Sequence, residues 1–261
     1  MKRTPIHVDL SVFPDSLRPI VEGADLYDSS CSPEARVLFI NRDLGYFLKK
    51  APAGSLKKEA DLTRYFHKKG LAAPVLSYVC DEYDWLLTQR VLGEDLTHKL
   101  YLDDPKRLCD VWAEQLRQLH ETDASDCPVK DRTAEYLALA HSNYRTGKHD
   151  LSLFPDGWGF ASAEQAFGQL QKNEHMLKSN VLIHGDYCLP NVIFDDWRFS
   201  GYIDLGNGGV GDRHIDVFWG VWTLNFNLKT DKYTARFLDA YGRDAVSTDL
   251  LRTVAAAEVF G

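Results

Sequence analysis

The sequence lacks any long hydrophobic run. No stretch of about 18 uncharged apolar residues, the length that marks a membrane-spanning helix, occurs along the chain. The basic start, Met1 to Pro5, is not followed by the apolar segment of a secretory signal peptide. We therefore expect neither a membrane span nor a signal peptide.

Paired cysteines are also missing. The five cysteines are widely spaced and form no C-x-x-C pair, which argues against a zinc site or a redox dithiol. An odd number of isolated cysteines fits a reducing compartment, so we expect a cytoplasmic protein. These cysteines are Cys31, Cys80, Cys109, Cys127 and Cys188.

The chain has no excess of positive charge. Thirty Lys and Arg against 38 Asp and Glu give a formal net charge of -8 at pH 7. Binding to nucleic acid requires a basic surface that neutralises phosphates, so we do not expect nucleic acid as a partner. The acidic balance favours a cationic ligand, although it is equally well explained as an aid to solubility.

What is present is the composition of a globular protein. Hydrophobic residues make up 44% and charged residues 26%, values that differ from those of disordered or fibrous chains. A chain of 261 residues accommodates one large domain or two lobes. No internal repeat is visible, so we divide the chain where its hydrophobic pattern changes.

The pattern changes near Gly93, from strand-like to helical. Short β-rich runs before this point are separated by polar turns and enclose one helix. Residues 1–93 are therefore expected to form a small lobe of five strands and one helix. Its clearest elements are strands at 36–40, 46–49, 75–80 and 85–90 and a helix at 55–69.

After Gly93 the chain is mostly helical. Apolar residues recur every three or four positions in 105–122, which predicts an amphipathic helix. Three short apolar strands interrupt the helical half, at 181–183, 192–194 and 201–203. Residues 94–261 thus form a second lobe, and the fold class is α+β. Further helices are predicted at 131–146, 162–175, 212–227, 231–241 and 247–259.

Polar loops beside the short strands carry residues suited to phosphoryl transfer. The segment 184–191, His-Gly-Asp-Tyr-Cys-Leu-Pro-Asn, places Asp186 and Asn191 five residues apart, and the strand end at 203–206 adds Asp204. Phosphoryl transfer needs a carboxylate that accepts the proton of the attacking hydroxyl, together with oxygen ligands for magnesium. A chance set of turn residues is the alternative, which the agreement of three elements in spacing disfavours.

His-Gly-Asp-x-x-x-x-Asn followed by Ile-Asp-x-Gly resembles the aminoglycoside phosphotransferase family, and the surrounding sequence resembles its 3'-phosphotransferases. The resemblance extends over 29–260. It implies a two-lobed protein-kinase-like fold and transfer of the γ-phosphate of ATP to an aminoglycoside hydroxyl, which confers antibiotic resistance. It further implies Asp186 as catalytic base and Asn191 and Asp204 as ligands of Mg²⁺. GTP in place of ATP, and a monomer or a dimer, stay open.

The first lobe offers a lysine and a glutamate for the nucleotide. Alternation along strand 46–49 places Phe47 and Lys49 on one face, so that the ring covers the base and the ammonium reaches the phosphates. Glu59 shares a helix face with apolar residues, where an unpaired carboxylate is costly, so Lys49 is its expected partner. Taken without the downstream motif, a solvated lysine and a surface glutamate are the simpler interpretation.

Other nucleotide contacts rest on the resemblance. No G-x-G-x-x-G sequence occurs in the first lobe. The stretch 29–33 resembles the serine-containing loop that covers the phosphates in aminoglycoside kinases, with Ser32 as donor, and fits an ordinary serine-rich turn nearly as well. The carbonyl of Gln89 and the N–H of Val91 are the expected hinge contacts to the base. Ile203 packs beneath the base or simply in the core.

The acceptor site agrees with the family only in part. Aminoglycosides are polycationic, so carboxylates are expected around them. The resemblance points to Asp156, to Asn225 and Asn227 where the family carries carboxylates, and to Glu258 with the terminal Gly261. A kinase of the same fold that acts on another small hydroxylated or amino compound is therefore the alternative. A pseudokinase is disfavoured by the intact set of catalytic residues.

Three polar residues near the catalytic loop are expected to be structural. His184 braces the loop, while Asp212 and Asp216 cap a helix and support the same loop. For Asp212 and Asp216 the alternative is a role as substrate ligands.

Overall fold

The chain forms two compact units. The structure, a computed structural model, describes residues 3–31, 35–152, 154 and 158–261. One unit consists of Met1–Asp95 with Pro190–Gly206, and the other of Leu96–Leu189 with Asn207–Gly261. The units therefore do not follow a single boundary near Gly93, because a segment from the second half of the sequence packs with the first.

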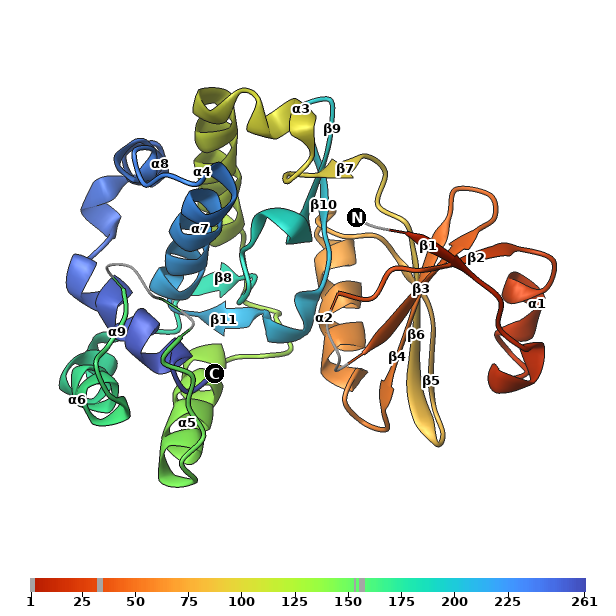
Figure 1. The fold of residues 1–261 in the computed structure, drawn as a ribbon, viewed down its shortest axis with the longest axis horizontal. Coiled ribbons are helices and arrows are strands. Elements are labelled where there is room, and N and C mark those ends of the chain that lie inside the picture. Colours follow the sequence, from red (N-terminus) through yellow and green to blue (C-terminus); the bar gives the residue numbers. More distant parts are fainter. Residues whose placement is uncertain (1–2, 32–34, 153, 155–157) are drawn as a thin grey trace. The chain divides into compact units, whose positions relative to one another are not determined.

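The first unit is built on an antiparallel sheet (Figure 1). In the part of the chain that the structure describes, this sheet has six strands in the order β1-β2-β3-β4-β6-β5, one more than expected. The extra strand, β1, has only three residues, too few for a recognisable alternation. The strands are β1 (Thr4–Ile6), β2 (Asp25–Asp28), β3 (Arg36–Asn41), β4 (Tyr46–Pro52), β5 (Val75–Cys80) and β6 (Tyr83–Gln89).

The two faces of this sheet pack against different segments. Leu48 of β4 is buried with Phe13 and Leu17 of the N-terminal segment, which contains α1 (Arg18–Val21). Helix α2 (Lys57–Lys68) packs through Ala60 against other residues of β4 and β6. Alternation along β4 therefore points Leu48 into this core, whereas the neighbouring side chains, Phe47 and Lys49, point to the opposite face of the sheet.

The segment 190–206 joins the first unit through a second, three-stranded sheet. Its order is β10-β9-β7, formed by β7 (Glu94–Asp95), β9 (Val192–Asp195) and β10 (Arg198–Tyr202). Gly93, with φ of 111°, lies against β9 so closely that a Cβ would be 2.2 Å from the carbonyl oxygen of Phe194. Only glycine fits this approach. The three short strands predicted in the second half of the chain are thus divided between the units, because the first of them, β8 (Val181–Ile183), pairs instead with β11 (Gly209–Gly211) in the second unit.

The second unit is mostly helical (Figure 1). Helix α4 packs against α7 and α8, and α9 packs against α6 and α7. Side chains of Asp or Ser at the N-caps of five helices accept hydrogen bonds from first-turn N–H groups, which explains where those helices begin. The helices are α3 (Lys99–Leu102), α4 (Pro105–Glu121), α5 (Arg132–Arg145), α6 (Ala163–Asn173), α7 (Arg213–Leu228), α8 (Thr234–Tyr241) and α9 (Thr248–Glu258).

The helices predicted after Gly93 are confirmed to within a few residues, whereas the four-residue α3 was not predicted. Within the described ranges, no helix combines the length and the apolar character needed to cross a membrane.

Candidate active site

A pocket of about 240 Å³ opens in the first unit. It is bounded by strands β3, β4 and β6, by helix α2 and by the segment 190–206. Of the nine residues predicted to bind nucleotide or metal, eight line this pocket, and the ninth, Ser32, lies outside the described residues. The eight are Phe47, Lys49, Glu59, Gln89, Val91, Asn191, Ile203 and Asp204.

Strand register explains which further residues line the pocket. Lys49 is paired with Val37 of β3 and with Leu86 of β6, so the three side chains share one face of the sheet. The sequence interpretation missed Val37 and Leu86 because pairing between strands is not visible in one sequence. Once the pairing of β4 with β3 and β6 is known, their position opposite Lys49 identifies them as pocket residues.

Lys49 links the pocket's two carboxylates. Its Nζ donates to Glu59 Oε2 and to Asp204 Oδ1, both at 2.8 Å. Burial alone would lower the pKa of Lys49, but the charges of Glu59 and Asp204 outweigh it and raise that pKa. Burial raises the pKa of Glu59 despite the opposing charge of Lys49. The predicted pairing of Lys49 with Glu59 is therefore observed, and it holds a cation in the wall of the pocket.

Asp204 and Asn191 present oxygen atoms from neighbouring backbone. The backbone carbonyl of Asn191 accepts a hydrogen bond from the backbone N–H of Ile203 at 3.0 Å. This bond holds the backbone of Asn191 next to that of Ile203, the neighbour of Asp204. Asp204 has a left-handed φ of 60°, uncommon for a non-glycine residue and concentrated at functional sites. Its side chain is 51% exposed, so its carboxylate is accessible despite the ion pair with Lys49.

This donor set suits Mg²⁺. Magnesium prefers carboxylate and amide oxygens, retains water ligands and shares its coordination with substrate phosphates. In the described ranges no group of three or more His, Cys, Asp or Glu side chains is arranged to hold a metal ion. A pair such as Asn191 and Asp204 is therefore adequate only for a metal that a phosphorylated ligand helps to bind.

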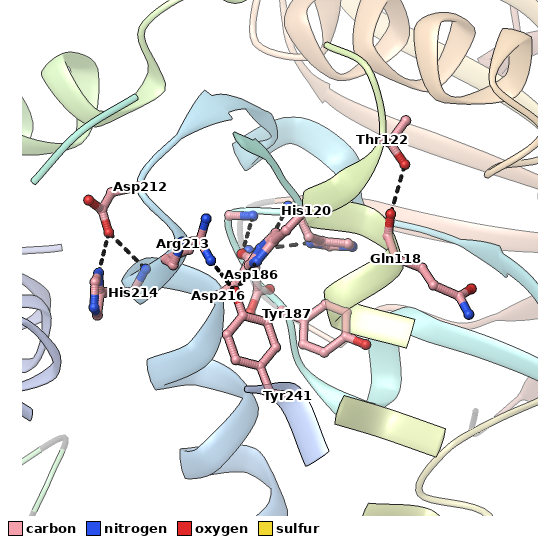
Figure 2. A network of polar contacts seen from close by, with 12 residues as sticks. Gln118, His120, Thr122, Asp186, Tyr187, Asp212, Arg213, His214, Asp216 and Tyr241 are labelled. Atoms are coloured by element: carbon pink, nitrogen blue, oxygen red, sulfur yellow. Dashed lines mark hydrogen bonds and ion pairs between the residues drawn. The ribbon is translucent and has the colours of Figure 1, made fainter. Parts of the chain in front are cut away.

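The part of the predicted catalytic loop that precedes Pro190 lies in the second unit and is held by Asp216 (Figure 2). The fully buried carboxylate of Asp216 accepts the N–H groups of His184 and Gly185, each at 2.7 Å. The N–H of Asp186 donates to His184 Nδ1 at 3.3 Å, so this imidazole nitrogen carries no proton. A Cβ on Gly185 would meet the carbonyl oxygen of Asn207 at 1.9 Å, which makes glycine necessary. The predicted bracing by Asp216 and His184 is confirmed.

A second layer of polar contacts supports Asp216 (Figure 2). His120 Nε2 lies 3.3 Å from Asp216 Oδ2, and His120 Nδ1 lies 2.7 Å from the hydroxyl of Tyr241. Burial raises the pKa of Tyr241 to about 12, although the charge of Arg213 opposes it, so the hydroxyl keeps its proton. The sequence interpretation missed these residues. The available signal was a histidine on the apolar face of α4, four residues after Leu116.

Asp212 caps α7 through contacts with His214 (Figure 2) and is also bonded from outside the helix. Its carboxylate accepts the N–H of His214 at 2.8 Å and that of Lys178 at 2.6 Å. His214 Nε2 accepts from the N–H of Ser247, so Nδ1 carries the hydrogen that it donates to Asp212 at 2.6 Å. Burial would raise the pKa of Asp212, but these bonds, led by that of His214, lower it. The expected structural role of Asp212 is confirmed.

The residues after Asp186 are anchored by α4 and α7. Tyr187 stacks on Trp112 with ring centroids 3.9 Å apart and donates its hydroxyl hydrogen to the backbone oxygen of Trp112. The N–H of Leu189 donates to Thr223 Oγ1 at 3.3 Å. Both contacts come from buried positions, so the backbone that follows Asp186 is fixed.

Glu258, one of the residues predicted to contact the acceptor, is held by two hydrogen bonds in the second unit. Its Oε1 accepts hydrogen bonds from the hydroxyl of Tyr136 and from Nε1 of Trp219, both at 2.9 Å. Burial raises the pKa of Glu258 to about 7, the two hydrogen bonds oppose this shift, and the charge of Asp186 adds to it. Glu258 is therefore coupled electrostatically to the predicted catalytic base.

The other predicted acceptor residues differ in their surroundings. Asn225 Oδ1 accepts from the hydroxyl of Thr234 at 3.1 Å, and Asn227 Nδ2 donates to the carbonyl oxygen of Thr223 at 2.8 Å. Both amides thus have partners within their own unit. Gly261 is exposed and its N–H donates to the carbonyl of Glu258, while Asp156 lies outside the described residues.

Comparison with known proteins places the chain in a family. The sequence model of the phosphotransferase enzyme family matches residues 32–253. The chain belongs to this family.

Individual members of the family are similar over most of their length. The chain is 46% identical over 257 residues to a probable aminoglycoside 3'-phosphotransferase of Lactococcus lactis subsp. lactis (strain IL1403), which covers 98% of both proteins. It is 30% identical over 211 residues to an aminoglycoside 3'-phosphotransferase of Niallia circulans, covering 79% of this chain and 80% of that protein.

A solved structure of the family shares the fold. The crystal structure of an aminoglycoside 3'-phosphotransferase of type VIII superimposes with a TM-score of 0.79 at 25% identity, covering 94% of this chain and 97% of the other. The predicted α+β, protein-kinase-like fold and the resemblance that implied it are therefore both confirmed.

Proposed function

We propose that this protein is an ATP-dependent aminoglycoside 3'-phosphotransferase that confers resistance to its substrate. The names of the similar proteins support the acceptor class, since the most similar of those described above shares 46% of its residues over nearly its whole length. The observation that carries the donor side is the pocket in which Lys49 joins Glu59 to Asp204 beside Asn191.

In this proposal the first unit binds the nucleotide. Phe47 covers the base, Gln89 and Val91 contact its edge through backbone groups, and Ile203 packs beneath it. Lys49, oriented by Glu59, contacts the phosphates as a fixed cation. Asn191 and Asp204 would hold Mg²⁺, which would supply positive charge to neutralise the charge that develops on the transferred phosphoryl group. Ser32 is proposed as a further phosphate donor.

Asp186 is proposed as the residue that positions the sugar hydroxyl and accepts its proton. Its backbone N–H is tied to His184, whose own N–H is tied to Asp216, so the carboxylate is carried by a rigid loop. Such positioning supplies most of the catalysis in phosphoryl transfer, where the protein does little covalent chemistry. Glu258 is proposed to attract an ammonium group of the acceptor, with Asp156, Asn225, Asn227 and Gly261 as weaker candidates for acceptor contacts.

The location and assembly state belong to the same proposal. We infer a cytoplasmic protein, because ATP is available there and because all five cysteines, each within the described residues, are free thiols. It acts as a monomer or a dimer on a small cationic substrate.

The deciding experiment measures ADP release by the purified protein with kanamycin, neomycin and a panel of other small alcohols and amino compounds. We expect turnover with kanamycin and neomycin, and a product that carries one phosphoryl group on the 3'-hydroxyl by NMR. Expression in a susceptible bacterium should raise the inhibitory concentration of the same drugs. Turnover of another alcohol, with none of the aminoglycosides, would contradict the proposal.

A further inference from the structure

A row of three aromatic rings runs along α7. Trp219 and Trp222 have centroids 5.3 Å apart in an edge-to-face arrangement, and Trp222 stacks on Phe226 with centroids 5.1 Å apart and planes 11° from parallel. Spacings of three and four residues place all three side chains on one face of the helix. We name Trp219, Trp222 and Phe226 the aromatic row.

The aromatic row packs on a buried ring at one end and is exposed to solvent at the other. Phe154 is 2% exposed and contacts both tryptophans edge-on, with centroids 6.0 Å from Trp219 and 6.2 Å from Trp222. Phe226, at the other end, is 55% exposed. A single exposed phenylalanine is ordinary, but one that continues a row of half-buried tryptophans extends an apolar surface from the interior outward.

The buried end of the row meets the proposed acceptor residues. Trp219 Nε1 donates to Glu258 Oε1 at 2.9 Å, and Glu258 is coupled electrostatically to Asp186. Thr223, the neighbour of Trp222, accepts the N–H of Leu189 from the catalytic loop. From Trp219 to Phe226 the helix rises by about 10 Å. The row therefore extends beside the loop that carries Asp186 over about 10 Å of helix, a length comparable to that of a multi-ring sugar, within one unit.

The exposed ring already contacts an ammonium group. Lys229 Nζ lies 4.0 Å from the ring centroid of Phe226, a cation–π distance. Lys229 is exposed and follows the last residue of α7, on a four-carbon side chain that is free to rotate away. The amides of Asn225 and Asn227 on either side are bonded within the unit. At this end of α7, the ring of Phe226 thus offers an exposed face to a cation.

We propose that the aromatic row is a subsite for an amino sugar ring remote from the reacting hydroxyl. The apolar face of that ring lies along Trp222, and one of its ammonium groups takes the place of Lys229 against Phe226. This subsite deepens the proposed function and rests on it. It assigns specificity to aromatic residues at positions where carboxylates are missing.

The test is steady-state kinetics with kanamycin and neomycin on three variants. Phe226→Ala should raise the acceptor KM about five- to tenfold, as expected for loss of a ring that binds a cation, with kcat and the ATP KM unchanged. Lys229→Gln should lower the acceptor KM about threefold, because the ring face becomes free. In the double variant Phe226→Leu with Lys229→Gln, the benefit of removing Lys229 should disappear.

Lys232→Gln is the matched control. Its ammonium lies 5.0 Å from the ring of Tyr233, so the change removes an equal charge from the same stretch of chain without freeing Phe226. If Lys232→Gln lowers the acceptor KM as much as Lys229→Gln does, general charge repulsion explains the effect and the subsite is wrong.

Two other outcomes separate the subsite from the proposed function. An unchanged acceptor KM in Phe226→Ala, with wild-type turnover intact, would overturn the subsite alone. A wild-type protein that phosphorylates no aminoglycoside would overturn both. Phe226 is exposed, so its replacement should leave the melting temperature within a few degrees of the wild type, and a thermal melt checks this.

Discussion

The pocket of the first unit and the proposed acceptor side of the second unit are built in different ways. In the pocket, side chains are positioned by strand pairing and by one ion-pair network around Lys49. On the acceptor side, Glu258 and the aromatic row lie on two helices and depend on contacts between their side chains. Strand register fixes the positions of many side chains together, whereas side chains on the surface of a helix can be substituted one at a time. Donor chemistry is thus tied to the fold more closely than acceptor choice.

The largest effect is expected from Asp186→Ala, which removes the proposed base from a loop that stays intact. Turnover should fall by about a hundred- to ten-thousandfold, the usual range for a general base. Nucleotide affinity, measured by calorimetry, should not change, because the pocket lies in the other unit. Asp231→Ala, at an exposed position after α7, is the control and should be fully active. Full activity of Asp186→Ala would refute the mechanism.

Metal binding comes next. Chelation of Mg²⁺ by EDTA should abolish ADP release, and added Mg²⁺ should restore it. Asp204→Asn should lower kcat by more than about a hundredfold and raise the Mg²⁺ concentration required for half-maximal rate, because a carboxylate ligand becomes an amide. Turnover that persists in EDTA would show that Asn191 and Asp204 have another role.

Glu59→Gln sharpens the contrast between the two regions. The variant removes the buried partner of Lys49 and leaves the ammonium to Asp204 alone. The KM for ATP should rise about tenfold, while the acceptor KM should stay within about twofold. Asp61→Asn is the matched control on the same helix, since its ion pairs with Lys57 and Arg64 are on the surface and are worth little. A change in acceptor KM alone would break the comparison.

The smallest effect concerns pH. The pKa of Glu258 is raised from 4.5 to about 7, so the carboxyl gains a proton and loses its charge as the pH falls through 7. Loss of this charge should weaken binding of a protonated ammonium group of the acceptor, by up to roughly tenfold from pH 8 to pH 6. Calorimetric titration at several pH values measures this change. The dependence should vanish in Glu258→Gln, and a dependence that survives there belongs to another group.

The parts predicted well from the sequence are those governed by local periodicity. Strand alternation placed Phe47 and Lys49 on one face, and helical spacing placed Glu59 among apolar residues, which was enough to infer their pairing. The bracing role of Asp216 followed from its position after the catalytic motif.

The parts that were missed depend on contacts between distant segments. His120 meets Tyr241 across 121 residues and Asp216 across 96, which no periodicity reveals. The bond between Asn225 and Thr234 is likewise not visible in the sequence. The catalytic and binding roles themselves stay predictions for the experiments above.

The segment 190–206 has a consequence for exchange between related genes. A crossover near residue 95 would transfer the strand with Lys49 and the helix with Glu59, and would leave Asn191 and Asp204 to come from the other parent. Lys49 contacts Glu59 on one side of the junction and Asp204 on the other. Recombinants should therefore retain function only where the two parents carry compatible residues at these positions. The first unit is therefore encoded by two separate segments of the gene, and neither segment alone can transfer its pocket to another protein.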